Sequence, residues 1–520
     1  MKQIRFFLFC FLFSGSTCFG QAGVLDSTFG VNGISPLYFP LYGPESLVLD
    51  SQSKIVLCGS YAGMNQNYCL IRYEQNGSLD NTFGNNGMAY GVYGSTGQGA
   101  EEGHCVTIQN DGKILVCGNG AGYIEIARYK TDGHSDSTFG TNGKIDYLIP
   151  GSQESEAWSL LVQQDGKIVI SGTATYPSVQ RIAIARFNIN GSIDPTFGNL
   201  GSTTTSLSQN YGWGVSIKQQ TDSKFLVGGY SASSSFIYKF ALVRYNADGS
   251  LDNTFGSGGK SEPFLNDTTH LYEYANQIAL QPDGKIIMVG STTNTTQIQF
   301  GLLRFNTDGS LDNTFGNGGL VTTDFMPFDN INEGRGVTLQ PDGKILVAGQ
   351  ASLNNSNILN YGAIARYKTN GTIDSTFGVY GKILVDIDSS TGVWPIIMQP
   401  DGKIVVGGGC ASQGLILLRY LSGLDDGVLD LSIANNPLLI YPNPIQSQAT
   451  LQYMLTKDEQ ITIELFDMQG KLVQQFITNE TRTKGKHEEV LHLNELLPSG
   501  SYILNISNGK NSQGVKVVKE

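Results

Sequence analysis

The sequence predicts an all-β protein: a seven-bladed β-propeller closed by an N-terminal strand and followed by a small C-terminal β-sandwich. Three observations predict it. Glycine makes up 65 of 520 residues, and only 15% of residues are charged, a composition typical of short strands and tight turns. Three short signatures each recur seven times. The order of these signatures leaves one unmatched member at each end of the chain.

The first 20 residues are predicted to be a signal peptide. Lys2 and Arg5 precede an apolar run, Phe6–Phe13, which is too short to cross a bilayer. Small residues follow, and we expect cleavage between Gly20 and Gln21; the alternative is a buried N-terminal strand. No later apolar run approaches 18 residues, so no transmembrane segment is expected. The net charge of −12 disfavours nucleic acid as a partner.

The repeats define the architecture of residues 21–422. The first signature is LDxTFGxxG or a variant, the second is a DGKI-like turn, and the third is Arg followed by Tyr or Phe. The Phe residues of the first signature are Phe29, Phe83, Phe139, Phe197, Phe255, Phe315 and Phe377. Their spacing rises from 54 to 62 residues and averages 58.

One repeat is predicted to form four short strands. In the fifth repeat these are Gln277–Leu280, Lys285–Val289, Phe300–Phe305 and Leu320–Asp324, with Asp-Gly turns after the first and third. Uninterrupted four-strand units of this length are typical of a β-propeller. A parallel β-helix has much shorter coils, and a series of sandwiches would need linkers.

The order of the charged residues predicts how the ring closes. In six repeats an Arg precedes the Asp of LDxTFG by eight residues: Arg72 and Asp80, Arg128 and Asp136, Arg186 and Asp194, Arg244 and Asp252, Arg304 and Asp312, Arg366 and Asp374. Asp26 lacks such an Arg, and Arg419 lacks such an Asp. Both gain a partner if residues from about Ile34 to Phe39 supply the fourth strand of the last blade, beside the strand ending at Tyr420. This arrangement also removes open sheet edges.

The repeated charges are expected to be structural. A catalytic site gathers a few groups in one place, whereas these residues occur once in every blade. We expect the Asp to cap the turn around TFG, the Arg to pair or stack nearby, the Phe to form the core between blades, and the DGK lysines to be solvated. Among the cysteines of the mature chain, Cys58 and Cys69 could face each other across a hairpin; the alternative is that all five, Cys58, Cys69, Cys105, Cys117 and Cys410, are small buried residues.

The quoted motifs resemble a known family, the delta-60 repeat β-propellers of secreted and surface bacterial proteins. LDNTFGNGG at 311–319, QPDGKILVAG at 340–349 and ARY at 365–367 carry the resemblance. It implies a propeller over residues 21–422 and no particular activity.

The C-terminal residues 438–520 form a different module, after a linker at 423–437. The motifs are Tyr441–Pro444, Ile461–Phe466, Asp467–Lys471, Leu497–Leu504 and Val515–Lys519. Their order resembles the type A C-terminal sorting domain of the type IX secretion system. The resemblance implies a partner, the type IX machinery, and a secreted or cell-surface protein; an ordinary appended sandwich is the alternative.

Comparison of the repeats with one another indicates where a ligand could bind. The DGK and DG turns, which are expected on one face, hardly vary, whereas the loops of the other face vary widely, and variable loops on a rigid scaffold often carry recognition. One position near the start of each innermost strand changes chemistry from repeat to repeat. We expect these residues to form a ligand-binding ring at the mouth of the channel: Glu45, His104, Trp158, Trp213, Asn276, Arg335 and Trp394.

The predicted function is therefore an extracellular binding module for a glycan or a surface protein, with no cofactor and no metal. The alternative for the tryptophans is that they only fill gaps between blades. The alternative function is a polysaccharide lyase or hydrolase at the channel mouth, using acids among Glu45, Glu101, Glu102, Glu154, Glu156 and Glu333 together with His104. The chain lacks HExxH, GxSxG and P-loop motifs.

Overall fold

A computed structural model describes residues 22–38, 41–61, 68–91, 102–235, 237–263, 272–293, 297–325, 330–353, 360–387, 391–410, 414–424, 439–455, 458–467, 472–494, 497–507 and 512–519. All regular elements in these ranges are β-strands. In the described part of the chain, no helix combines the length and the apolar character needed to cross a membrane. The predicted signal peptide and most of the predicted linker lie outside the described residues.

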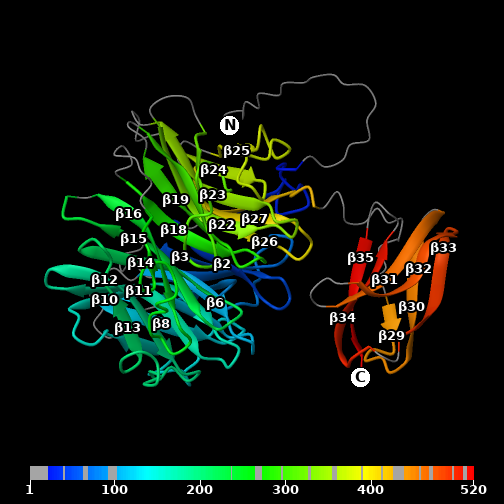
Figure 1. Ribbon diagram of the computed structural model, residues 1–520, viewed down its shortest axis with the longest axis horizontal. Coiled ribbons are helices and arrows are strands. Elements are labelled where there is room, and N and C mark those ends of the chain that lie inside the picture. The colour runs from blue at the N-terminus through cyan, green and yellow to red at the C-terminus, as the bar shows by residue number, and fades with distance from the viewer. Residues whose placement is uncertain are drawn as a thin grey trace. The chain divides into compact units, whose positions relative to one another are not determined.

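Four-stranded antiparallel units follow one another along the chain, from blue through green to yellow in Figure 1. Blade 1 contains β2 (Leu41–Leu49), β3 (Ile55–Tyr61), β4 (Tyr68–Tyr73) and β5 (Met88–Tyr90). Blade 2 contains β6 (Glu102–Ile108), β7 (Ile114–Gly120), β8 (Tyr123–Tyr129) and β9 (Lys144–Tyr147). Blade 3 contains β10 (Glu154–Val162), β11 (Ile168–Tyr176), β12 (Val179–Phe187) and β13 (Ser202–Thr205).

The remaining blades repeat this order. Blade 4 contains β14 (Tyr211–Gln219), β15 (Phe225–Ala232), β16 (Tyr238–Tyr245) and β17 (Lys260–Ser261). Blade 5 contains β18 (Tyr274–Leu280), β19 (Ile286–Thr293), β20 (Ile298–Phe305) and β21 (Leu320–Thr323). Blade 6 contains β22 (Asn330–Leu339), β23 (Ile345–Leu353), β24 (Asn360–Tyr367) and β25 (Lys382–Val385). Blade 7 contains β26 (Thr391–Met398), β27 (Ile404–Cys410), β28 (Gly414–Tyr420) and, from the other end of the chain, β1 (Ile34–Tyr38).

The N-terminal strand closes the ring as predicted. β1 pairs antiparallel with β28, with Ile34 opposite Leu418 and Tyr38 opposite Gly414. The two unmatched charges meet, because Arg419 Nη2 lies 2.7 Å from Asp26 Oδ2. The seven innermost strands contact one another in succession, and β26 contacts β2. The seven-bladed ring and its closure are therefore confirmed.

The core lies between the blades, so each blade needs both neighbours. One cluster joins Val56 and Leu70 of blade 1 to Val116 of blade 2, and another joins Leu57 of blade 1 to Leu417 of blade 7. All seven Phe of the TFG turns are fully buried. Burial of such side chains contributes on the order of 1.5–3 kcal/mol each.

The repeated Asp, Arg, Phe and Lys form one clamp per blade. In blade 5, Asp312 Oδ1 accepts bonds from the backbone N and the hydroxyl of Thr314, which caps the turn. The Arg304 guanidinium lies 4.5 Å above the Phe315 ring, its Nε donates to Asp312 Oδ2 at 2.7 Å, and its Nη1 donates to the carbonyl of Thr369 in blade 6. The clamp thus ties each blade to the next, which confirms the structural role of the Asp, Arg and Phe.

The expectation for the DGK lysines was wrong. In every blade this Lys forms an ion pair with the clamp Asp, at 2.7 to 3.5 Å, and only 18 to 32% of its side chain is exposed. The hairpin between the first two strands bends the lysine back over the turn that holds the Asp. The clamp Asp therefore receives two cations.

The C-terminal strands belong to a second compact unit, separate from the propeller unit Gly23–Ser422. Its strands are β29 (Leu439–Tyr441), β30 (Gln448–Leu455), β31 (Glu459–Asp467), β32 (Leu472–Arg482), β33 (Gly485–His492), β34 (Gly500–Ser507) and β35 (Ser512–Lys519). They form a three-stranded sheet, β29-β30-β33, and a four-stranded sheet, β32-β31-β34-β35. A common core that includes Leu451, Leu465 and Ile506 lies between the sheets. The unit is a small β-sandwich, as predicted.

Candidate functional site

The two faces of the propeller differ. The tight-turn face, at the hairpins that join the first to the second and the third to the fourth strand, carries the clamps. The loop face, at the opposite ends of the strands, carries the connections that differ in length and sequence from blade to blade. The candidate recognition residues therefore lie where the innermost strands begin, on the loop face.

A β-bulge interrupts each innermost strand close to the loop face. In β10, Ala157 pairs with Gly172 and Ser159 with Ser171, so Trp158 is the extra residue. The same register gives the full set of bulge residues: Glu45, His104, Trp158, Val215, Asn276, Arg335 and Trp394. A bulge turns its side chain away from regular strand alternation. Six of the seven residues predicted for the ring are thus structurally equivalent.

The expectation that Trp213 is the seventh member was wrong by two residues. Gly214 pairs with Gly229 and Ser216 with Gly228, which makes Val215 the bulge residue of blade 4. Trp213 lies directly opposite Tyr230, on the second strand of the same blade. It therefore occupies the position that Glu102, Glu156 and Glu333 occupy in blades 2, 3 and 6.

Close backbone approach explains why the second strand of every blade carries glycine opposite the bulge. A Cβ added to Gly172 would lie 1.8 Å from the carbonyl oxygen of Glu156. A Cβ added to Gly229 would lie 1.8 Å from the backbone carbonyl oxygen of Trp213. Only glycine leaves room for the bulged strand here.

Hydrogen bonds between blades hold the bulges in place. The side chain that follows the bulge accepts the backbone N–H of the next innermost strand. Ser46 Oγ accepts from Val106 N at 3.2 Å, Ser216 Oγ from Ile278 N at 3.2 Å, and Gln277 Oε1 from Val337 N at 2.6 Å. The bulge residues are thus presented by a rigid part of the fold.

Charged groups from blades that are not neighbours act on one another near the axis. Protein surrounds Glu45 on most sides although its side chain retains access to solvent, and this desolvation raises its pKa to about 7. Arg335 of blade 6 opposes the rise and Glu102 of blade 2 adds to it. Arg335 also acts on Tyr230 of blade 4. Glu45 and Arg335 thus lie on the innermost strands of blades 1 and 6, and their charges act on each other although blade 7 separates these blades.

Aromatic stacking involves two further members of the ring. The imidazole of His104 stacks on the indole of Trp158, with ring centres 4.2 Å apart, and its Nε2 lies 2.7 Å from Asn119 Oδ1. Burial lowers the pKa of His104, which favours the neutral imidazole. The guanidinium carbon of Arg335 lies 5.8 Å from the Trp394 ring centre. Both contacts join residues of adjacent blades.

Not every predicted residue is available to a ligand. Asn276 Nδ2 donates to the carbonyl of Gly334 at 2.7 Å, which is a contact between blades 5 and 6. Glu333 accepts bonds from Arg335 at 2.7 Å and from Gln350 at 3.0 Å. Glu101 lies outside the described residues. The solvent-exposed side chains of the ring are Glu45 and Arg335, whereas His104, Trp158, Val215, Asn276 and Trp394 are partly buried.

The sequence comparison missed the aromatic residues around Trp213. Tyr211, Tyr230, Tyr238, Tyr272 and Tyr274 form ring contacts with Trp213 or with one another at the loop-face end of blades 4 and 5. A count of aromatic residues at equivalent repeat positions would have found them, because the other blades are not enriched in this way.

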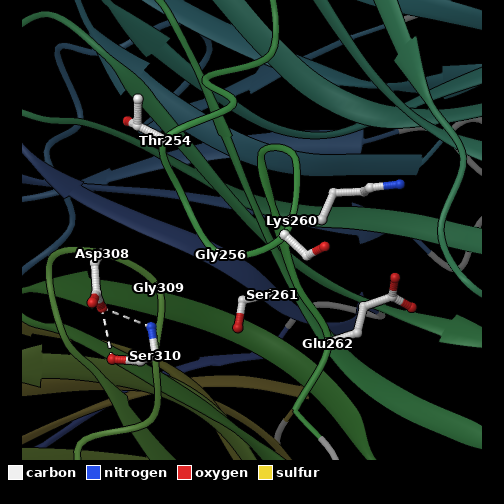
Figure 2. Close-up of a pocket in the computed structure, with 9 residues that line it drawn as sticks. Thr254, Gly256, Lys260, Ser261, Glu262, Asp308, Gly309 and Ser310 are labelled. Carbon is white, nitrogen blue, oxygen red and sulfur yellow. Dashed lines mark hydrogen bonds between the residues drawn. The ribbon is translucent and has the colours of Figure 1, made fainter.

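Pockets on the tight-turn face belong to the repeated scaffold. A cavity of about 400 Å³ lies beside Gly256, Lys260 and Glu262 of blade 4 and the Asp308 turn of blade 5 (Figure 2). There Asp308 accepts bonds from the backbone N and hydroxyl of Ser310, a turn found in several blades. Within the described ranges no group of three His, Cys, Asp or Glu could hold a metal ion.

Cys58 and Cys69, for which the sequence left a disulfide open as a possibility, do not face each other across the hairpin. Cys58 lies opposite Leu70, and Cys69 lies opposite Gly59. Cys58, Cys69 and Cys117 carry free thiols and are buried in the core. The alternative expectation, small buried residues, describes these three.

Family models match both parts of the chain. A model described as a domain of unknown function (DUF5122) beta-propeller matches residues 53–83, 109–139, 163–197, 220–255, 281–315, 340–377 and 399–432. A model described as a secretion system C-terminal sorting domain matches residues 439–520. No curated protein shows significant similarity to the sequence.

Solved structures resemble the chain only at the level of the fold. PorZ, an essential surface component of the type IX secretion system of Porphyromonas gingivalis, is 11% identical with a TM-score of 0.42; the match covers 94% of this chain and 59% of PorZ. Extracellular domains of Drosophila Semaphorin 1b are 9% identical, with 89% and 94% coverage and a TM-score of 0.42. A PL25 ulvan lyase is 11% identical, with 78% and 94% coverage and a TM-score of 0.41. None of these values supports an argument about function.

Proposed function

The chain is a β-propeller of DUF5122 repeats with a type IX secretion system C-terminal sorting domain, and from this premise we propose that it is an extracellular binding module. The sorting domain implies export to the cell surface or secretion. The recognition surface in this proposal is the loop face around the propeller axis, where the bulge residues lie.

The convergence of unlike side chains on one end of the axis carries the proposal. The tight-turn face repeats the same clamp seven times, which is what a scaffold requires. At the bulges, by contrast, the chain places an acid, a base, two indoles, an imidazole and an amide at equivalent positions. The charge of Arg335 in blade 6 opposes the rise in the pKa of Glu45 in blade 1, although blade 7 lies between these two blades. Such a mixture of polar anchors and aromatic surfaces is typical of ligand sites.

The export route completes the proposal. Residues 1–20 serve as a signal peptide that is removed, residues 21–422 are the exported passenger, residues 423–437 are a linker, and residues 438–520 engage the secretion machinery. The mature protein is secreted or held at the cell surface, where the loop face meets its ligand.

Substitution of the ring tests the proposal. The purified chain is screened against glycans and cell-surface proteins, and the double variant Trp158→Ala with Trp394→Ala is compared with it. We expect the double variant to lose binding at least about tenfold, because both half-buried indoles are removed. Tyr380→Asn is the control, since Tyr380 lies on the tight-turn face and is 81% exposed. Its backbone has a positive φ, and blades 1 and 2 carry Asn86 and Asn142 at the equivalent position with a positive φ as well. Undiminished binding by the double variant would refute the proposal.

One observation favours an enzyme as the second candidate. A carboxyl group with a pKa near 7 can accept and donate protons at neutral pH, and Glu45 is such a group. Arg335 close by could neutralise an acidic substrate. If the protein is a lyase or hydrolase of an extracellular polysaccharide, products will accumulate during the screen and Glu45→Gln will abolish their release. Binding without product release leaves only the binding module.

A further inference from the structure

We propose that the ligand is a neutral polysaccharide, and that it lies along a radial row of aromatic side chains on the loop face of blades 4 and 5. This inference rests on the proposed function and names its ligand class. The aromatic row consists of Tyr211, Trp213, Tyr230, Tyr238, Tyr272 and Tyr274.

The six rings are in continuous contact. Trp213 stacks on Tyr230, with centres 4.9 Å apart, and Tyr211 lies 6.4 Å from Trp213. Tyr230 meets Tyr274 at 5.1 Å, and Tyr274 meets Tyr238 at 4.2 Å. Tyr272 then stacks beside Tyr238 at 5.7 Å. No gap interrupts the aromatic surface between Trp213 and Tyr272.

The strands place the aromatic row on a radial line. Trp213 is on the innermost strand β14, Tyr230 on the second strand β15 and Tyr238 on the third strand β16 of blade 4. Tyr274 begins β18, the innermost strand of blade 5. The aromatic row therefore starts beside the ring at the axis, where Glu156 and Arg335 act on Tyr230, and runs outward between two blades.

The other blades show that the propeller does not need these rings. The position of Tyr230 follows the glycine that faces the bulged strand. At this position blades 2, 3, 5, 6 and 7 carry Asn119, Thr173, Ser291, Gln350 and Gly409. Small or polar side chains thus satisfy the same fold, and the aromatic row is a special feature of blades 4 and 5.

The chemistry of the aromatic row favours a neutral sugar polymer. Five of its six side chains are partly buried and Tyr272 is 40% exposed, so the rings are fixed in place and still reach solvent. The faces of pyranose rings stack on aromatic rings, and tyrosine hydroxyls bond to sugar hydroxyls. The contacts within the aromatic row are aromatic, and Arg335, which acts on Tyr230 at its inner end, is already paired with Glu333 at 2.7 Å. A chain with a net charge of −12 would also repel a polyanion.

Affinity electrophoresis of the intact chain tests the inference. Gels contain laminarin, xyloglucan, hydroxyethyl cellulose or mannan as neutral polysaccharides, and alginate as an acidic one. We expect at least one neutral polymer to retard the wild-type chain and alginate not to. Tyr230→Ser, which introduces the residue that blade 5 carries at this position, should weaken retardation about tenfold, and Tyr272→Ser should weaken it several-fold. Tyr380→Asn should leave it unchanged.

The outcomes separate this inference from the proposed function. If Trp158→Ala with Trp394→Ala loses binding while Tyr230→Ser and Tyr272→Ser retain it, the aromatic row is not the binding track, but the axial site stands. Binding to alginate alone, or to a protein alone, overturns the neutral polysaccharide and leaves the binding module intact. Tyr272→Ser keeps the test valid if Tyr230→Ser fails to fold, because Tyr272 is exposed.

Discussion

A single carboxylate organises the tight-turn end of each blade. In blade 1, Asp80 Oδ1 caps the turn through Thr82, and Oδ2 receives Arg72 at 2.7 Å and Lys54 at 2.8 Å. Arg72 also donates to the carbonyl of Thr131 in blade 2. One side chain therefore stabilises a turn, a blade and the contact with the next blade, and its loss leaves Arg72 without a carboxylate and Lys54 with Glu74 alone.

Removal of one clamp charge should destabilise the propeller strongly. We expect Asp312→Asn to lower the free energy of unfolding by about 3 kcal/mol, since Arg304 becomes an uncompensated buried cation. Tryptophan fluorescence during urea unfolding measures the effect on the propeller alone, because Trp158, Trp213 and Trp394 all lie within it. Asp283→Asn is the matched control: this exposed Asp caps only its own turn through Lys285 N. Equal losses for both variants would contradict the account.

The clamps also predict how stability depends on pH. Burial alone would raise the pKa of Asp26, but bonds from Thr28 and Lys403 and the charge of Arg419 lower it from 3.8 to about 2. The pKa of the other six clamp Asp is lowered in the same way. Because the folded state holds these protons less tightly than the unfolded state, the stabilisation is complete above about pH 5. It is lost as the pH falls toward 2, and the shift at Asp26 alone corresponds to about 2 kcal/mol. A fluorescence-monitored midpoint in urea that is the same at pH 5 and pH 3 would contradict this.

Two residue positions show what the sequence could not reveal. In blades 1 to 6 the DGK lysine is 23 to 30 residues from its Asp in the chain, and in blade 7 Lys403 and Asp26 lie near opposite ends of the propeller sequence, so only the strand register brings each pair together. Trp213 was assigned to the bulge position in place of Val215 because an alignment error of two residues along a strand leaves every side chain on the same face. Val215, which is apolar, looked like the first core residue, and only the bulge register identifies it.

The N-terminal strand is the element on which ring closure depends. Besides the β1–β28 pairing, Asp26 N donates to Arg419 O, Arg419 N donates to Gly33 O, and the Arg419 guanidinium covers Phe29 at 4.7 Å. The sequence predicted this closure because two charges were left over, one at each end of the repeats. It could not predict the bulges with certainty, because one inserted residue shifts the alternation by only one position, as between Ala157 and Leu160, and the innermost strands are too short to make that shift plain.

Loss of the closing clamp should release the N-terminus. We expect Arg419→Ala to make residues before Leu41 about tenfold more susceptible to proteolysis under native conditions, because the opening now needs less free energy. Arg304→Ala loses the same contacts inside the chain and should release no N-terminal fragment. Limited proteolysis with intact-mass analysis distinguishes them. The account fails if the N-terminal fragment appears equally fast in both variants.

At the scale of the whole molecule, the repeated clamps, the proposed recognition surface and the sorting domain lie in separate regions of the chain. The tight-turn face carries the clamps, the loop face carries the bulge ring and the aromatic row, and a second compact unit carries the sorting domain. The repeat period and the terminal motifs were enough to predict the propeller and the sorting domain. The aromatic row proposed as a ligand site could not be predicted from the sequence, because Tyr230 and Tyr274 come together only through tertiary packing.

The division of the chain predicts the effect of a truncation. Deletion of residues 439–520 should leave the tryptophan-monitored unfolding midpoint unchanged, because the core of the sandwich is its own. The truncated protein should accumulate inside the producing cell and be absent from its surface and medium. Fractionation and immunoblotting of cells producing either form measure this, and surface display of the truncated protein would contradict the assignment of export to the tail.

Hydrogen–deuterium exchange of the intact chain with a bound polysaccharide tests the central claim most directly. We expect the ligand to protect amides of residues 211–216, 228–232 and 272–276, together with the bulges beside Glu45 and Arg335, and to leave the turns around Asp283 and Asp342 unchanged. Protection confined to those turns, or to residues 439–520, would contradict the claim that the loop face around the axis is the recognition surface.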